Sequence, residues 1–164
     1  MLSKAAGEKI FNRLSDSCGG KVSPESISSL SIEKIRHTGT SWKKAEFISN
    51  LAQTVIEDKF DFAALEKMSD ESAIHQLKQL SGVGTWTAKM YLIFVLNRQD
   101  ILPYEDAAFL QAYRVVYNTD ETSPKSIKQK CNMWSPYSSI AARYMYRLLD
   151  GGLLKQYCDH TNNN

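Results

Sequence analysis

Apolar residues recur every three or four positions along almost the whole chain, and this spacing restricts the fold more than any other feature. Between residues 5 and 14, for example, the apolar positions are Ala5, Ala6, Ile10, Phe11 and Leu14. Such positions share one face of an α-helix and can pack into a core. No segment alternates apolar and polar residues with the Val, Ile and Thr content of a strand. We therefore predict an all-α fold of about eight to ten short helices.

Serine and aspartate residues indicate where these helices begin. Ser23-Pro24 and Ser123-Pro124 each place a capping side chain before a proline, which favours the first helical turn. The same pattern predicts a helix start at Ser135-Pro136. Further starts are expected at Ser31, Ser41, Asp61, Ser69 or Asp70, Thr85 and Asp106. Expected ends are Gly19-Gly20, Gly39 and Leu80.

The composition excludes several classes of protein. The 164 residues, 43% of them hydrophobic and 23% charged, are typical of one globular domain or a small two-lobed one. No run of 18 apolar residues indicates a membrane span, and the first ten residues do not resemble a secretory signal. Cys18, Cys131 and Cys158 lie far apart without a CxxC pair, which argues against disulfides and against zinc or iron–sulfur ligation. A net charge of +2 is too small to indicate nucleic-acid binding by itself.

The segment LSGVGTWTA at residues 80–88 is the most informative stretch of the sequence. Two glycines around Val83 allow a tight reversal of the backbone, with the valine anchored beneath it. The amides of Gly82, Gly84 and Thr85 would then point outward at a helix N-terminus, where unpaired N–H groups and the helix dipole favour phosphate. A plain helical hairpin, whose glycines serve only the turn, explains the same residues.

Four motifs, in order, resemble those of the helix-hairpin-helix DNA glycosylases. Residues 80–88 are similar to the family's hairpin, L-x-G-[VI]-G-x-x-T-A, and residues 39–45 (GTSWKKA) to its G-x-S-x-x-K-A turn. Residues 102–106 (LPYED) resemble the proline-rich turn that ends in the catalytic aspartate. Residues 134–142 (WSPYSSIAA) resemble the W-x-P-[YW]-R-S-x-A segment of the 3-methyladenine glycosylase II branch. The resemblance implies a two-lobed helical bundle within a single domain of residues 1–164, with a hairpin motif at residues 73–96 and a central cleft.

The same resemblance implies a DNA glycosylase of base excision repair that flips alkylated purines such as 3-methyladenine out of double-stranded DNA and excises them. Asp106 corresponds to the carboxylate that stabilises positive charge on the sugar as the base departs. Its alternative role is the N-cap of the helix 107–117, a position that favours Asp. Both roles are compatible, since a capping carboxylate is rigidly held.

Aromatic residues are the candidates for the base pocket. Trp86 stands where bifunctional relatives carry a Schiff-base lysine, so the resemblance implies a monofunctional enzyme that leaves an abasic site. Trp86, Tyr137 and Tyr104 offer flat faces to a flipped base, and stacking is favoured when alkylation makes that base cationic. The alternative is core packing at helix junctions, which we favour for Trp134.

Contacts to the DNA backbone are expected from the hairpin residues Gly82, Val83, Gly84, Thr85 and Thr87. Four lysines are weaker candidates for phosphate contacts: Lys4, Lys43, Lys44 and Lys89. By the resemblance, the carbonyls of Leu80 and Gly82 can hold a monovalent cation when DNA is bound. We expect no side-chain metal site, no cofactor, and a monomer located in the nucleoid of a prokaryote or the nucleus of a eukaryote.

Three features depart from the family pattern. The residue that fills the vacated base stack belongs at about Met1 or just before it, so we expect the N-terminal lobe to be short. Ser138 replaces the family's usual arginine, which removes a phosphate contact. Only Cys158 lies where the iron–sulfur branch has four cysteines, which excludes that branch. Two alternatives therefore stay open: a non-catalytic helix-hairpin-helix DNA-binding module, and a glycosylase for oxidised or deaminated bases.

Overall fold

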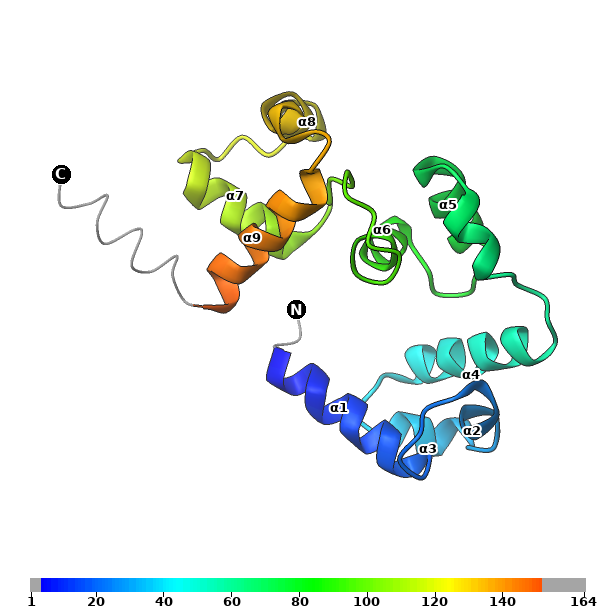
Figure 1. The fold of residues 1–164 in the computed structure, drawn as a ribbon. Coiled ribbons are helices and arrows are strands. Elements are labelled where there is room, and N and C mark those ends of the chain that lie inside the picture. Colours follow the sequence, from blue (N-terminus) through cyan, green and yellow to red (C-terminus); the bar gives the residue numbers. More distant parts are fainter. Residues whose placement is uncertain (1–3, 152–164) are drawn as a thin grey trace. The chain divides into compact units, whose positions relative to one another are not determined.

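A computed structural model describes residues 4–151, and every regular element among them is helical (Figure 1). The expected all-α class is therefore confirmed. Contacts divide these residues into two compact units: those up to Met68 together with Gln76–Gly82, and Ser69–His75 together with those from Val83 onward. Among the described helices, none combines the length and the apolar character needed to cross a bilayer.

The first part of the chain holds four α-helices and a short 3-10 helix. They are α1 (Lys4–Ser17), α2 (Pro24–Ser28), α3 (Ile32–His37), α4 (Trp42–Ile56) and η1 (Ala63–Lys67). The helix α5 (Asp70–Leu77) follows and contributes residues to both units. The remaining elements belong to the second unit: α6 (Thr85–Phe94), α7 (Ala107–Tyr117), α8 (Pro124–Cys131), η2 (Asn132–Trp134) and α9 (Ser138–Asp150).

Serine caps fix four of the helix starts. Ser23, Ser31, Ser41 and Ser123 precede α2, α3, α4 and α8, and each side chain accepts a hydrogen bond from the amide three residues later. Such a bond satisfies one of the N–H groups that a helix start leaves without a partner. These four predicted starts are therefore confirmed.

The core of the first unit lies where α4 packs against α2 and α3. Its fully buried centre is formed by Ile35 of α3 and Ala45 of α4. Leu14, Ile27 and Ala52 complete the cluster. Alanine side chains on α4 are small, so neighbouring helices can pack close to it. The apolar positions predicted from the sequence thus form one buried cluster.

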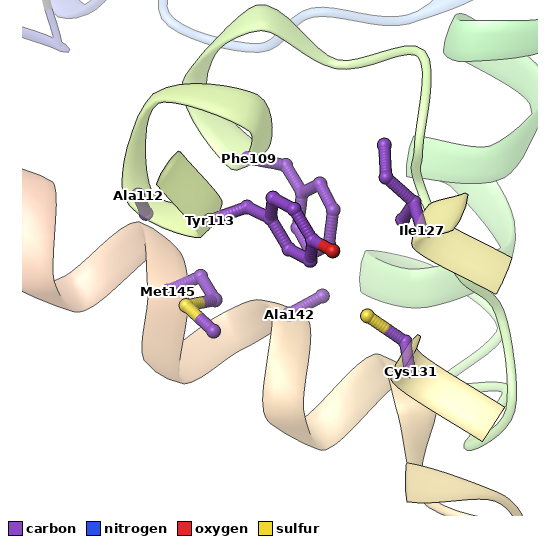
Figure 2. Close-up of a cluster of buried hydrophobic side chains, with 7 residues drawn as sticks. All are labelled: Phe109, Ala112, Tyr113, Ile127, Cys131, Ala142 and Met145. Atoms are coloured by element: carbon purple, nitrogen blue, oxygen red, sulfur yellow. The ribbon is translucent and has the colours of Figure 1, made fainter. Parts of the chain in front are cut away.

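The core of the second unit is aromatic and joins α7, α8 and α9. Figure 2 shows the rings of Phe109 and Tyr113 from α7 lying beside each other, with their centroids 6.2 Å apart. Trp134 meets the Phe109 ring edge-on at 6.1 Å, which confirms its interpretation as a core residue. The other buried members of the cluster are Ala112, Ile127, Cys131, Ala142 and Met145.

The predicted helix start at Ser135-Pro136 is wrong, because α9 begins only at Ser138. The Ser135 side chain does not cap a helix but donates its hydroxyl to Asp100 Oδ2 at 2.6 Å. The Ser138 amide and hydroxyl donate to Asp100 Oδ1. A carboxylate distant in sequence thus caps α9. The residues next to the helix start do not indicate such a partner, because local capping patterns involve only neighbouring positions.

Two other boundaries also differ from expectation. The segment predicted as a helix from Asp61 is a short 3-10 helix, although Asp61 Oδ1 accepts a hydrogen bond from the Ala64 amide at 3.0 Å. The helix expected to reach Leu80 ends at Leu77. Leu80 is nevertheless buried, because apolar residues in the following turn also pack inward.

Candidate functional site

Asp106 caps α7 and is almost completely buried. Its backbone is extended, and its Oδ1 accepts a hydrogen bond from the Phe109 amide at 2.9 Å. Only 4% of the residue is exposed. The capping role predicted for Asp106 is therefore confirmed, and it fixes one of the two carboxylate oxygens.

The second carboxylate oxygen is bound by Trp86. The indole Nε1–H, on the second residue of α6, donates to Asp106 Oδ2. Trp86 itself is 48% exposed, so a large part of the indole remains accessible while its N–H is occupied. The structure thus brings together the predicted catalytic carboxylate and the first predicted base-pocket aromatic.

Tyr146 of α9 is a neighbour of this pair that the sequence did not indicate. Its hydroxyl contacts the Met90 sulfur at 3.8 Å, and Met90 follows Trp86 by one helical turn. Burial, together with the nearby Asp106 carboxylate, raises the pKa of Tyr146. Tyr146 lies within an amphipathic helix, where an aromatic residue is typical of ordinary core packing. The neighbouring sequence therefore does not indicate that it lies near Asp106.

Tyr104 lies against cationic side chains. The Lys89 and Lys128 ammonium groups lie 3.7 and 4.5 Å from the centroid of its ring. Lys89 is buried and forms a salt bridge with Glu105 at 2.8 Å. The expectation that Lys89 contacts phosphate is therefore wrong, because its ammonium is bound inside the protein. The role of Tyr104 in a base pocket stays a prediction.

Tyr137 immediately precedes α9 and is 54% exposed. Asp100 holds the turn on either side of it through Ser135 and Ser138. Hydrogen bonds from these two serines lower the pKa of Asp100. Tyr137 is thus an exposed aromatic on an anchored turn, and its place in a base pocket stays a prediction.

Gly82, in the first unit, is required by its backbone conformation and by its neighbour. Its φ is +81°, a region that side-chain-bearing residues rarely adopt. A Cβ at this position would also overlap the ring of Phe47 on α4. No other residue can meet both conditions without a shift of the surrounding structure.

In the second unit, α6 begins with backbone amides that have no intrahelical partner. Gly84 is the N-cap residue and supplies no capping side chain. The Ala88 amide is the first to reach back to the Gly84 carbonyl, at 3.0 Å, which leaves those of Thr85, Trp86 and Thr87 for other acceptors. Val83 is half-buried beside this start. Such a start favours an anion, although contact with DNA phosphates stays a prediction.

Some of the features expected from the sequence concern metal ions or residues outside 4–151. These residues contain no group of three or more His, Cys, Asp or Glu side chains that could hold a metal ion. The proposed cation on the carbonyls of Leu80 and Gly82 stays a prediction. Met1, Cys158 and the side chain of Lys4 lie outside the described part of the chain.

Both the motifs and the fold have counterparts in known proteins. A family model described as "HhH-GPD superfamily base excision DNA repair protein" matches residues 2–136. This chain belongs to the HhH-GPD superfamily. The resemblance drawn from the sequence motifs is therefore confirmed.

Among curated HhH-GPD relatives, DNA-3-methyladenine glycosylase 1 of Schizosaccharomyces pombe is 31% identical over 150 residues, covering 89% of this chain and 66% of the relative. A putative DNA-3-methyladenine glycosylase of Bacillus subtilis is 27% identical over 128 residues, covering 77% of this chain and 45% of the relative. The chain thus spans slightly less than two thirds of the first relative and less than half of the second.

Solved HhH-GPD structures show the same fold. The Schizosaccharomyces pombe 3-methyladenine DNA glycosylase in complex with abasic DNA matches with a TM-score of 0.79 and 31% identity, over 90% of this chain and 73% of that one. A DNA-3-methyladenine glycosidase from Bacillus halodurans matches with a TM-score of 0.74 and 29% identity, over 90% and 69% of the two chains.

Proposed function

We propose that this chain is a monofunctional DNA glycosylase that hydrolytically excises alkylated purines such as 3-methyladenine during base excision repair. The single observation that carries the proposal is the contact between the Trp86 indole N–H and the Asp106 carboxylate. Membership of the HhH-GPD superfamily and the names of the relatives support it. The two residues singled out for catalysis and for base stacking meet although they are 20 positions apart.

The chemistry assigns separate tasks to the two residues. A base inside the duplex must first be flipped out, and the exposed indole of Trp86 offers a surface for stacking a cationic base. As the glycosidic bond breaks, positive charge develops on the deoxyribose. The Asp106 carboxylate stabilises that charge, and two hydrogen bonds hold it in a fixed orientation, so little reorganisation is needed during the reaction.

The proposed product is an abasic site in an intact strand. Where the bifunctional relatives carry a nucleophilic lysine, this chain has Trp86, and an indole nitrogen cannot form a Schiff base. The buried ammonium of Lys89, one turn further along α6, is bound to Glu105. We therefore expect strand breakage only after alkali cleaves the abasic site.

Double-stranded DNA is the proposed partner. The amides of Gly82, Gly84, Thr85 and Thr87, with Val83 as anchor, would contact its phosphates, and the carbonyls of Leu80 and Gly82 would hold a monovalent cation in the complex. We propose that the protein acts as a monomer, in the nucleoid or the nucleus, wherever chromosomal DNA is repaired.

A panel of duplex oligonucleotides tests the proposal, each with one alkylated, oxidised or deaminated base. We expect free 3-methyladenine and alkali-dependent nicking from the alkylated duplexes. Asp106→Asn should slow release by about 100-fold or more, because a neutral amide stabilises the developing cation poorly. The control Asp120→Asn removes the same charge from an exposed position, and its rate should equal that of the parent. Equal rates for Asp106→Asn and the parent would contradict the mechanism.

A second candidate is a non-catalytic DNA-binding module. The near-complete burial of Asp106, with both oxygens bound, favours it, because these bonds alone would explain the residue as structural. Such a module would bind damaged and undamaged duplexes equally, with affinity falling steeply as salt rises, and release no base. A glycosylase for oxidised or deaminated bases would instead be identified by the panel.

A further inference from the structure

Lys89 lies on α6, three residues after Trp86, and is buried although its side chain is charged. The side chain is only 9% exposed. A buried ammonium loses its hydration and must be compensated by hydrogen bonds or an opposite charge. Burial accordingly lowers the pKa of Lys89, while the Glu105 carboxylate acts in the opposite direction.

The compensation comes from the segment immediately before Asp106. Lys89 Nζ donates to the Leu102 carbonyl oxygen at 2.9 Å and contacts both carboxylate oxygens of Glu105, at 2.9 and 2.8 Å. It also lies 3.7 Å from the centroid of the Tyr104 ring, a favourable cation–π geometry. One ammonium group therefore joins the first and the last residue of the segment 102–105.

This segment is a turn that ends at Asp106. The Asp106 amide donates to the Pro103 carbonyl at 3.0 Å, and α7 begins at the next residue. Two side chains of α6 therefore hold the segment 102–106: Lys89 binds its backbone and Glu105, while Trp86 binds the Asp106 carboxylate.

We propose that Lys89 and Glu105 form a clamp that positions Asp106 for base excision, an inference that rests on the proposed glycosylase function. Lys89 is a positioning residue, because its ammonium is bound by Leu102 and Glu105 and acts on Asp106 through the turn. The opposite charges of the pair compensate each other. The clamp therefore fixes the turn without adding net positive charge beside a base that is already cationic.

Single-turnover excision and DNA affinity, measured together, test the clamp. Lys89→Met keeps an unbranched side chain but removes the ammonium. We expect its excision rate to fall roughly 10- to 100-fold, as for a displaced catalytic group, with the Kd for DNA within about two-fold of the parent. Lys128→Met is the matched control, because the exposed Lys128 lies over the same Tyr104 ring from α8. Its rate should be unchanged.

Three outcomes of these kinetics would overturn the clamp. The first is a Lys89→Met rate equal to the parent's. The second is an equal loss of rate and affinity, which would make Lys89 a binding residue. The third is recovery of the rate in Lys89→Met combined with Glu105→Gln. That double variant restores the charge balance but not the anchored turn, so recovery would show that charge alone matters.

The indole N–H resonance of Trp86 provides a readout that needs no activity. In ¹⁵N-labelled protein it is assigned by its loss in Trp86→Phe. We expect Lys89→Met to shift it, because the Asp106 carboxylate moves, and to leave the indoles of Trp42 and Trp134 in place. An unchanged Trp86 resonance overturns the clamp. If the parent protein releases no base, the proposed function fails while this measurement still tests the clamp.

A gentler variant covers the case in which Lys89→Met does not fold. Glu105→Gln leaves the Lys89 contacts with Leu102 and Tyr104 in place and removes only the charge partner. We expect the same direction of shift in the Trp86 indole and a smaller loss of rate than for Lys89→Met. A parental rate and a parental spectrum in Glu105→Gln would overturn the clamp as well.

Discussion

Gly82 lies directly against the ring of Phe47, and its backbone adopts a φ of +81°. Gly82→Ala adds a methyl group that overlaps the ring and strains the backbone. We expect a loss of about 2–4 kcal/mol in the free energy of unfolding, measured by urea denaturation. Gly84→Ala is the matched control, because its φ is ordinary and a Cβ there meets nothing within 4 Å.

Removing the ring as well separates the two effects. In the combination of Gly82→Ala with Phe47→Ala, the overlap disappears and only the backbone strain remains. The two substitutions should therefore cost less together than the sum of their separate effects. Strict additivity would mean that the close approach of Gly82 to Phe47 does not determine the stability of this turn.

Asp100 predicts a contribution to stability that depends on pH. Hydrogen bonds from Ser135 and Ser138 lower its pKa below the ordinary value of 3.8. The folded state therefore binds fewer protons than the unfolded state, and the stabilisation is fully present above that ordinary value. It decreases as the pH falls through the lower pKa of the folded state.

The measurement is the urea midpoint followed from about pH 6 downward in the parent and in Asp100→Asn. The parent should lose more stability than the variant below the ordinary pKa of Asp100. Asp120→Asn, which removes an exposed Asp from the same unit, should follow the parent. Parallel curves for the parent and Asp100→Asn would exclude the proposed contribution.

Cys131 should be chemically inert in the folded protein. Burial raises the pKa of its thiol to about 11. At pH 8, about one such thiol in a thousand is ionised, and the thiolate is the reactive form. We expect alkylation, followed by peptide mass spectrometry, to spare Cys131 until urea unfolds the chain, while the half-buried Cys18 reacts earlier. Equal labelling of Cys131 before and after unfolding would contradict its burial.

Tyr137 should matter for function but not for stability. It is 54% exposed, so Tyr137→Ala removes little packing. If the ring stacks on the flipped base, excision from alkylated duplexes should slow by roughly 10-fold, whereas Tyr137→Phe keeps the parental rate. Tyr144→Ala, also at an exposed tyrosine of the second unit, is the control and should leave excision unchanged. An excision rate independent of the residue at 137 would remove Tyr137 from the base pocket.

Local features of the sequence predicted the helix starts well. Ser23, Ser31, Ser41 and Ser123 act within four residues of their own position, so the sequence around each contains all the information needed. The start of α9 was mispredicted for the opposite reason. Its cap is Asp100, which lies 38 residues before Ser138, and only the folded chain brings the two together.

In the candidate site, too, some features could be predicted from the sequence, whereas contacts between distant residues could not. The resemblance predicted Asp106 and Trp86 residue by residue, and the structure places them in contact. The burial of Lys89 could not be predicted, because an isolated lysine usually lies at the surface with its charge in water. Its partner Glu105 is 16 residues away, and their pairing depends on how the turn before α7 folds back onto α6.

The two hydrogen bonds of Asp106 link the proposed catalytic group to the stability of α7. Since Oδ1 caps that helix and Oδ2 accepts the indole proton, the carboxylate cannot swing outward without uncapping it. In the proposed reaction, the damaged nucleotide would therefore have to move to a carboxylate whose position is fixed. A substitution that removes this side chain also removes the cap of α7, so the requirement for a stable fold alone would favour keeping Asp106, whether or not the chain excises bases.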